Sequence, residues 1–243
     1  MRTLACCLLV GCANAGTVTV PGGTPSLPVE TTDEVPTGDT ATPTEPTTTV
    51  TTDACPPVTE DTRIAVVSDI DETLTTSDNE WLTQIALPNT DPRMRPEADA
   101  VMWAYVQKGY RVIYVTSRGE GLRLLDGTTA RDATERWLDD HGFPWTSDGV
   151  FLADGVGALG GEATDYKTDT LQGLIDAGVT IAFAYGNADT DIAAYINVGI
   201  PSDHIFLVGK LAGGLGVEGI PDAEAYGDHL PRVERFVPCA PEP

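Results

Sequence analysis

The fold of this chain is decided by one stretch, Arg63-Ile-Ala-Val-Val-Ser-Asp-Ile-Asp-Glu-Thr-Leu-Thr75. Residues 64–67 form a short apolar run rich in β-branched side chains, which predicts a buried strand. Asp69 and Asp71 follow at once, and residues two apart on an extended backbone point the same way, so the two carboxylates converge. Such carboxylates repel each other unless a cation lies between them or one holds a proton. A divalent cation of the magnesium type resolves the repulsion; the alternative is that both residues only cap the following loop.

Further strands and helices are predicted from apolar periodicity and from Gly and Pro positions. The predicted strands after the first are residues 110–115, 150–152, 179–185 and 204–208. The predicted helices are residues 96–109, with Pro96 at the favoured first position, 129–140 and 166–178. Turn chemistry dominates 75–95, and the chain after residue 210 is typical of acidic coil or a short helix.

Polar side chains follow two of these later strands. Thr116, Ser117 and Arg118 come after one, and the run Gly186-Asn-Ala-Asp-Thr-Asp191 comes after another. Polar groups at the carboxyl ends of buried strands lie where open α/β sheets bind ligands. A structural explanation also stays open, with Thr116 as a helix cap and Arg118 as a surface cation.

The spacing Asp-x-Asp-x-Thr after a strand resembles the first motif of the haloacid dehalogenase superfamily of phosphatases. The longer string from Val66 to Thr75, Val-Val-Ser-Asp-Ile-Asp-x-Thr-x-Thr, is similar to the lipin-type phosphatidate phosphatase domain, although that family usually has Gly where this chain has Glu72. Thr116, Lys167 and the run ending at Asp191 match the second, third and fourth motifs in order. The resemblance covers about residues 63–210. It implies an α/β chain with a three-layer, Rossmann-like haloacid dehalogenase fold, a mostly parallel sheet and no large cap domain.

The resemblance also implies roles for individual residues. Asp69 would attack phosphorus, and Asp71 would protonate the leaving oxygen and later activate water. The phosphoryl group would be held by Thr116 and Lys167, with substrate contacts from Thr73, Ser117 and Arg118. Mg²⁺ would bind the Asp69 carboxylate, the Asp71 backbone carbonyl, Asn187 and Asp191, the last directly or through water. Asn187 stands where the superfamily normally has Asp, as it also does in the lipin-type domain, and it removes one charge from the site. Asp189 is a competing ligand that fits the spacing less well than Asp191.

The implied function is a Mg²⁺-dependent phosphomonoester hydrolase that acts through an aspartyl-phosphate. Short segments between the motifs leave no room for a large lid, and an open site suits a lipid head group such as that of phosphatidate. Small soluble phosphate esters are an alternative substrate class. The competing class is a non-catalytic module that binds a lipid or another partner on the same fold.

The net charge restricts the partners of the chain. It has 243 residues, 41% of them hydrophobic, and 37 acidic against 14 basic residues give a formal net charge of −23. Nucleic acid is excluded as a partner because its binding requires basic surface. Anionic lipid surfaces repel such a chain on average, so an anionic substrate needs help from a metal and a few local cations.

The first 57 residues are predicted to lie outside the catalytic domain. Residues 1–12 resemble a bacterial lipoprotein signal peptide, in which Cys12 becomes lipidated and anchors an exported protein to a membrane; the alternative is a cytosolic protein with a chance apolar start. Residues 13–57 have the Thr- and Pro-rich acidic composition of a disordered linker, and residues 58–243 form the phosphatase-like domain. Cys55 and Cys239 flank this domain and are either paired in a disulfide or present as two free thiols.

Overall fold

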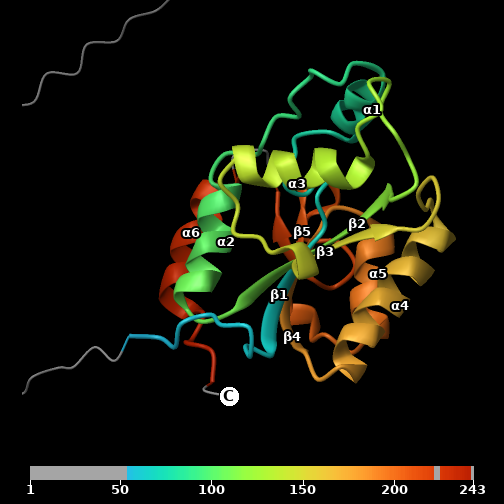
Figure 1. Cartoon of the computed structure of the whole chain (residues 1–243). Coiled ribbons are helices and arrows are strands. Elements are labelled where there is room, and N and C mark those ends of the chain that lie inside the picture. The colour runs from blue at the N-terminus through green and yellow to red at the C-terminus, as the bar shows by residue number, and fades with distance from the viewer. Residues whose placement is uncertain (1–53, 222–224, 242–243) are drawn as a thin grey trace, which may run out of the picture. The chain divides into compact units, whose positions relative to one another are not determined.

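The computed structural model describes residues 54–221 and 225–241 (Figure 1). The predicted signal peptide, the lipidation site Cys12 and the linker up to residue 53 lie outside the described residues. Among the helices of the described part, none is both long and apolar enough to cross a bilayer.

One parallel sheet forms the centre of the described fold. Its strands are β1 Ile64–Ser68, β2 Arg111–Gly119, β3 Val150–Ala153, β4 Thr180–Gly186, β5 Ile205–Val208 and β6 Glu218–Ile220. Their order is β3-β2-β1-β4-β5-β6, and every neighbouring pair is parallel. All the carboxyl ends therefore lie at one edge of the sheet. The strand order reverses direction at β1 and β4, which is where open sheets of this kind form a ligand crevice.

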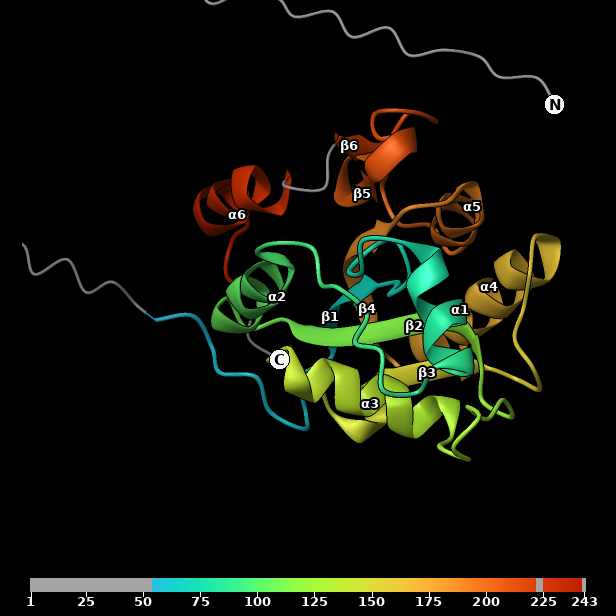
Figure 2. The same cartoon turned by 90° about the horizontal axis from the view of Figure 1, so that it is seen from above.

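Helices cover both faces of the sheet. They are α1 Asp78–Ala86, α2 Ala98–Gln107, α3 Ala130–Asp140, α4 Gly161–Asp176, α5 Asp189–Asn197 and α6 Ala225–Phe236. Helices α4 and α5 lie on one side of the sheet, and α2, α3 and α6 lie on the other, as two perpendicular views show (Figures 1 and 2). The three-layer α/β architecture predicted from the motif resemblance is confirmed, and the described residues between the motifs hold no large cap domain.

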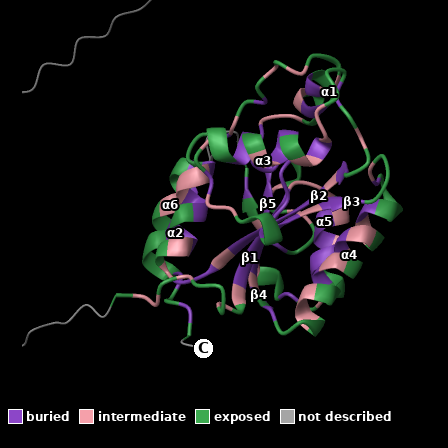
Figure 3. Cartoon of the chain, in the orientation of Figure 1, coloured by how far each residue is buried: buried purple, intermediate pink, exposed green. Residues whose placement is uncertain are grey.

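Alternate side chains of β1 pack into two hydrophobic cores, one on each face of the sheet. Ala65 and Val67 pack with α4 and α5, whereas Val66 packs with the core under α2, α3 and α6. All three side chains are fully buried, as expected for a central strand with helices on both faces. The strands and the inward sides of the helices are the buried layer of Figure 3, and the outer helix faces are exposed.

Several predicted boundaries are wrong for local reasons. Helix α2 begins at Ala98 rather than Pro96, because Glu97 has a left-handed backbone (φ 62°) that interrupts the first turn. Helix α4 begins at Gly161 rather than residue 166, which places Lys167 in its second turn. Helix α1 interrupts the stretch predicted as turns, and its N-cap Ser77 accepts a hydrogen bond from the Asn79 backbone amide.

Both ends of the described domain meet at a disulfide. Cys55 and Cys239 are bonded, with their Cα atoms 5.2 Å apart. Pro56 lies against Gly109, where its carbonyl oxygen would be only 2.7 Å from an added Cβ. Cys55 and Pro56, which the sequence predicts to belong to the linker, therefore pack on the folded domain.

Candidate active site

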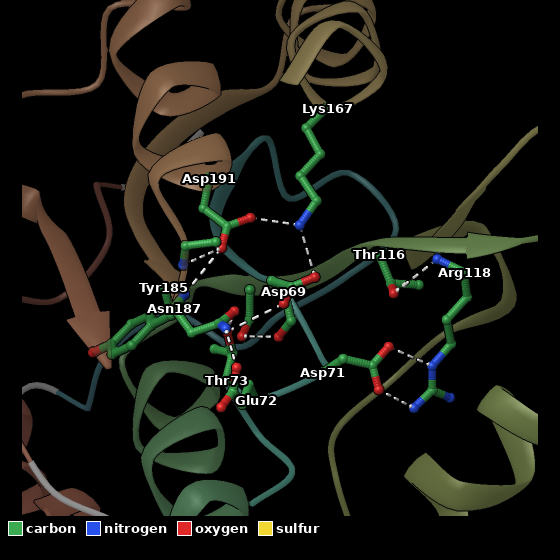
Figure 4. Close-up of polar contacts among 12 residues, drawn as sticks. Asp69, Asp71, Glu72, Thr73, Thr116, Arg118, Lys167, Tyr185, Asn187 and Asp191 are labelled. Atoms are coloured by element: carbon green, nitrogen blue, oxygen red, sulfur yellow. Dashed lines mark hydrogen bonds and ion pairs between the residues drawn. The ribbon is translucent and has the colours of Figure 1, made fainter. Parts of the chain in front are cut away.

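Predicted catalytic and metal-binding side chains meet at the carboxyl edge of the sheet. Asp69 follows β1, Thr116 lies near the end of β2, Lys167 reaches over from α4, and Asp191 lies in the first turn of α5 (Figure 4). These four residues are buried, each at most 4% exposed. They line one cavity of about 420 Å³, so four stretches that are distant in sequence contribute to a single site.

The floor of the cavity is a buried cation shared by two carboxylates. Lys167 Nζ donates to Asp69 Oδ1 at 2.8 Å and to Asp191 Oδ1 at 2.5 Å. Burial raises the pKa of Asp69 to about 7, although the Lys167 ammonium acts in the opposite direction. Burial by itself would lower the pKa of Lys167, but the Asp191 and Asp69 carboxylates outweigh burial and raise that pKa above its ordinary value. One ammonium therefore incompletely compensates the two carboxylates.

The turn after β4 fixes Asp191. Its Oδ2 accepts hydrogen bonds from the backbone amides of Asn187 at 2.9 Å and Ala188 at 3.0 Å. The turn requires glycine at position 186, because an added Cβ would lie 2.4 Å from the Asp191 Cβ. Both Asp191 oxygens are thus engaged within the protein, and a direct bond to a metal requires one of these contacts to open.

Asp71 forms a bidentate ion pair with Arg118. Arg118 Nε and Nη2 donate to the two Asp71 oxygens at 2.8 and 2.7 Å, and Nη1 donates to Thr134 Oγ1 at 3.0 Å. The guanidinium also lies over the Trp81 ring, 4.2 Å from its centroid. In this arrangement the predicted acid–base residue and the predicted substrate cation bind each other, and each must be released before it can contact a substrate.

The metal-ligand prediction can be tested against the oxygen atoms around Thr73. Its hydroxyl lies 3.2 Å from Asp69 Oδ2 and 3.0 Å from Asn187 Oδ1, yet it has one proton to donate. Two oxygen acceptors therefore converge on a single donor, next to a carboxylate whose negative charge is incompletely compensated. This donor set fits a hard divalent cation. Within the described residues no three His, Cys, Asp or Glu side chains gather in metal-binding geometry, and the predicted set instead relies on an amide and a backbone carbonyl.

Glu72 keeps the turn that the family usually makes with glycine. Its φ is 57°, in the left-handed region that glycine adopts freely. Arg95 Nε and Nη2 both donate to the Glu72 carbonyl oxygen, at 3.1 and 2.8 Å. The unusual residue is therefore accommodated without loss of the turn between Asp71 and Thr73.

The outer part of the cavity is apolar, and the sequence reading missed most of it. Trp81, Leu82 and Ile85 of α1 line one side, and the loop before α4 contributes Val156 and Leu159. Gly119, at the end of β2, lies close against the loop that contains Val156, since a Cβ on Gly119 would be 2.0 Å from the Val156 carbonyl carbon. The i, i+4 spacing from Trp81 to Ile85 after a Ser cap was the signal that could have revealed α1.

Ser117 also lines the cavity, and its carbonyl accepts a hydrogen bond from the Ala158 amide at 3.1 Å. Thr116 Oγ1 accepts from the Arg118 amide at 3.3 Å. The structure thus brings every predicted catalytic and substrate-contacting residue to the same cavity or to its immediate surroundings.

Comparison with known proteins identifies related sequences. Residues 66–209 match the family model described as "PITM 1-3, LNS2 domain". The protein retinal degeneration B of Drosophila melanogaster is 31% identical over 176 residues, which are 72% of this chain and 12% of that protein. Membrane-associated phosphatidylinositol transfer protein 3 of Homo sapiens is 27% identical over 158 residues, or 65% of this chain and 15% of that protein. The chain thus spans only a small part of these relatives.

Comparison with solved structures finds weak likenesses, two of them to proteins described as phosphatases. A class C acid phosphatase from Bacillus anthracis is 18% identical, with a TM-score of 0.38 and 54% of each chain covered. A HAD-like phosphatase from Mesorhizobium loti is also 18% identical, with a TM-score of 0.46, and covers 74% of this chain and 88% of that one. The family model matches more than half of the residues of this chain. The chain therefore belongs to the PITM-type LNS2 domain family, a lipin-like group with a fold of the haloacid dehalogenase type.

Proposed function

We propose that this chain is a Mg²⁺-dependent phosphomonoester hydrolase that forms an aspartyl-phosphate on Asp69. The observation that carries the proposal is the buried contact of Asp69 with Lys167 at the cavity floor. A nucleophilic carboxylate at a strand end, beside a cation that can neutralise an incoming phosphoryl group, is the arrangement that phosphoryl transfer requires.

The proposed chemistry uses the chain's own residues at each proton and phosphoryl transfer. An Asp69 oxygen forms a bond to phosphorus while the bond from phosphorus to the leaving oxygen breaks, and Asp71 supplies the proton to that oxygen. Asp71 then takes a proton from water as the water oxygen attacks phosphorus and releases Asp69. Thr116 and Lys167 hold the phosphoryl oxygens. Mg²⁺, held by Asp69, the Asp71 carbonyl and Asn187, would supply charge neutralisation.

The proposed substrate class is a lipid phosphomonoester such as phosphatidate. Leu159, Val156 and Leu82 line the cavity and are 85%, 80% and 61% exposed. Exposed apolar side chains around a polar floor suit a substrate with an anionic head and an apolar body. Relatives of this chain are named as membrane-associated phosphatidylinositol transfer proteins, which agrees with a phospholipid ligand.

The Asp71–Arg118 ion pair favours a second candidate function, a module that binds a lipid phosphate without hydrolysing it. In the bidentate pair both Asp71 oxygens are occupied. If substrate binding does not open this pair, no acid or base is available for either step. The two functions differ in turnover and not in the ligand that they bind.

Phosphate release from para-nitrophenyl phosphate, measured with the purified chain in Mg²⁺ and in EDTA, tests the proposal. Activity that requires Mg²⁺ and falls to background in Asp69→Asn is expected. Asp203→Asn, at an exposed aspartate in the short turn before β5, serves as the matched control. Equal activity of wild type and Asp69→Asn excludes Asp69 as the nucleophile. Binding of phosphatidate vesicles without any phosphate release, from either substrate, supports the binding module instead.

The lipid preference is tested by the ratio of two rates. Phosphate release from phosphatidate in phosphatidylcholine vesicles is compared with release from para-nitrophenyl phosphate. Leu159→Ser is expected to lower the vesicle rate relative to the soluble rate, because it removes apolar surface from the rim. An unchanged ratio contradicts a role of the rim in lipid recognition.

A further inference from the structure

We infer that Glu72 is a positioning residue that fixes the side-chain amide of Asn187 so that its oxygen faces Asp69. The inference rests on the proposed function, since it concerns how this chain presents oxygen ligands to Mg²⁺. It addresses one departure in this chain, Glu72 in place of the Gly that the lipin-type family usually has.

The backbone gives no reason for a glutamate at position 72. A left-handed φ of 57° disfavours any side chain with a Cβ, by about 1–2 kcal/mol. The contacts that hold this turn are made by the Glu72 carbonyl with Arg95, and glycine would make them equally well. The reason for the side chain must therefore be sought in what the carboxylate contacts.

The Glu72 carboxylate contacts Asn187, in the turn between β4 and α5. Glu72 Oε2 accepts a hydrogen bond from Asn187 Nδ2 at 3.3 Å, and Glu72 Oε1 lies 3.5 Å from Lys210 Nζ. The Lys210 side chain is 91% exposed and the Glu72 side chain is 28% exposed, so Lys210 contacts Glu72 from the solvent side. The contact between Glu72 and Asn187 lies on the side of Glu72 that faces the site (Figure 4). Positions 72 and 187, 115 residues apart, are thereby joined across the site.

A carboxylate decides which way an amide points. An ionised carboxylate only accepts hydrogen bonds, so Asn187 must direct its NH₂ group toward Glu72. The Asn187 oxygen then faces Thr73 Oγ1 at 3.0 Å and, beyond it, Asp69. The reversed amide would bring two acceptors together at the Glu72 contact.

Mg²⁺ affinity, measured by isothermal titration calorimetry on the purified chain without substrate, tests this inference. Glu72→Gly restores the family residue and removes both the acceptor and the left-handed strain. It is expected to weaken Mg²⁺ binding by about tenfold, a typical effect of losing a group that orients a ligand. Thermal unfolding in EDTA should show no loss of stability, which separates the effect from misfolding.

Two further variants sharpen the test. Glu72→Gln keeps an oxygen that can accept from Asn187 Nδ2 but adds an NH₂ group that also permits the reversed amide, so its Mg²⁺ affinity is expected to lie between those of wild type and Glu72→Gly. Glu97→Gly is the matched control, because Glu97 is another glutamate with a left-handed φ, 62°, but lies exposed at the start of α2; it should leave the affinity unchanged.

The outcomes separate this inference from the proposed function. Glu72→Gly affinity within threefold of wild type overturns the inference while leaving the hydrolase intact. Glu72→Gln affinity as weak as that of Glu72→Gly also overturns it, because the charge of Glu72 and not the amide orientation then matters. A wild-type chain that takes up no Mg²⁺ overturns the metal-dependent function, and the inference with it.

Discussion

Replacing Lys167 by methionine removes the cation that two buried carboxylates share. Nζ lies 2.8 Å from Asp69 and 2.5 Å from Asp191, and the three side chains are at most 6% exposed. Methionine has a similar shape, so the change removes a charge without opening a large cavity. Breaking a buried ion pair by deleting one partner costs about 3–5 kcal/mol, because the remaining charge is left uncompensated. We expect Lys167→Met to lower the free energy of unfolding by this amount at pH 8 in EDTA.

Urea unfolding followed by circular dichroism and by tryptophan fluorescence measures this loss. Asp69→Asn, made in the wild type and in Lys167→Met, completes a double-mutant cycle around the contact. Since asparagine removes one of the uncompensated charges, the double variant should be more stable than Lys167→Met by at least about 1 kcal/mol. A loss below about 1 kcal/mol in Lys167→Met, or no recovery in the double variant, would refute the electrostatic reasoning.

Three further predictions concern stability. Burial lowers the pKa of His229, which lies 2.7 Å from the Tyr185 hydroxyl, from 6.5 to about 4. The unfolded chain then binds more protons between these pH values, so stability is complete above pH 6.5 and falls by up to about 3 kcal/mol as the pH drops to 4. His229→Gln should flatten this part of the pH profile in urea unfolding, and an unchanged profile would contradict the assignment. Gly186→Ala should lower the free energy of unfolding by about 1–3 kcal/mol or more, because the added Cβ clashes with Asp191. The control Gly173→Ala lies in open space on α4 and should raise the free energy of unfolding by about 0.5–1 kcal/mol. Chemical denaturation compares the two variants, and equal effects would count against the clash. Reduction of the Cys55–Cys239 disulfide, which links positions 184 residues apart, should lower stability by up to about 5 kcal/mol, measured as a fall in Tm with dithiothreitol; an unchanged Tm in a chain shown to be reduced would argue against it.

Much of the scaffold could be predicted from local sequence. The apolar run at β1, followed by Asp69 and Asp71, requires only neighbouring residues to define a buried strand and a polar strand end. The same holds for β4 and the turn from Gly186 to Asp191. These patterns predicted that the candidate residues lie together at the carboxyl edge of the sheet, which is where the structure has them, because parallel strands carry their carboxyl ends to the same side.

Elements with mixed local signals were predicted less well. The stretch containing α1 has Pro and Asn residues after the helix, which led to a prediction of turns throughout. The C-terminal strand β6 and helix α6 were predicted only as coil or short helix, and their burial comes from packing: β6 pairs with β5, and α6 packs against α2. His229 of α6, for which the sequence suggested no role, is buried beside Tyr185 of β4.

The sequence by itself determined which polar residues follow the buried strands and in what order they occur, because strand periodicity and turn chemistry act between near neighbours. The tertiary structure decided their pairing: Asp71 with Arg118, 47 residues away, Asp69 with Lys167, 98 residues away, and Glu72 with Asn187, 115 residues away. Such contacts depend on how strands and helices are placed against one another. Charged and amide side chains then pair according to how deeply they are buried and which way they point, and neither property can be predicted from neighbouring residues alone.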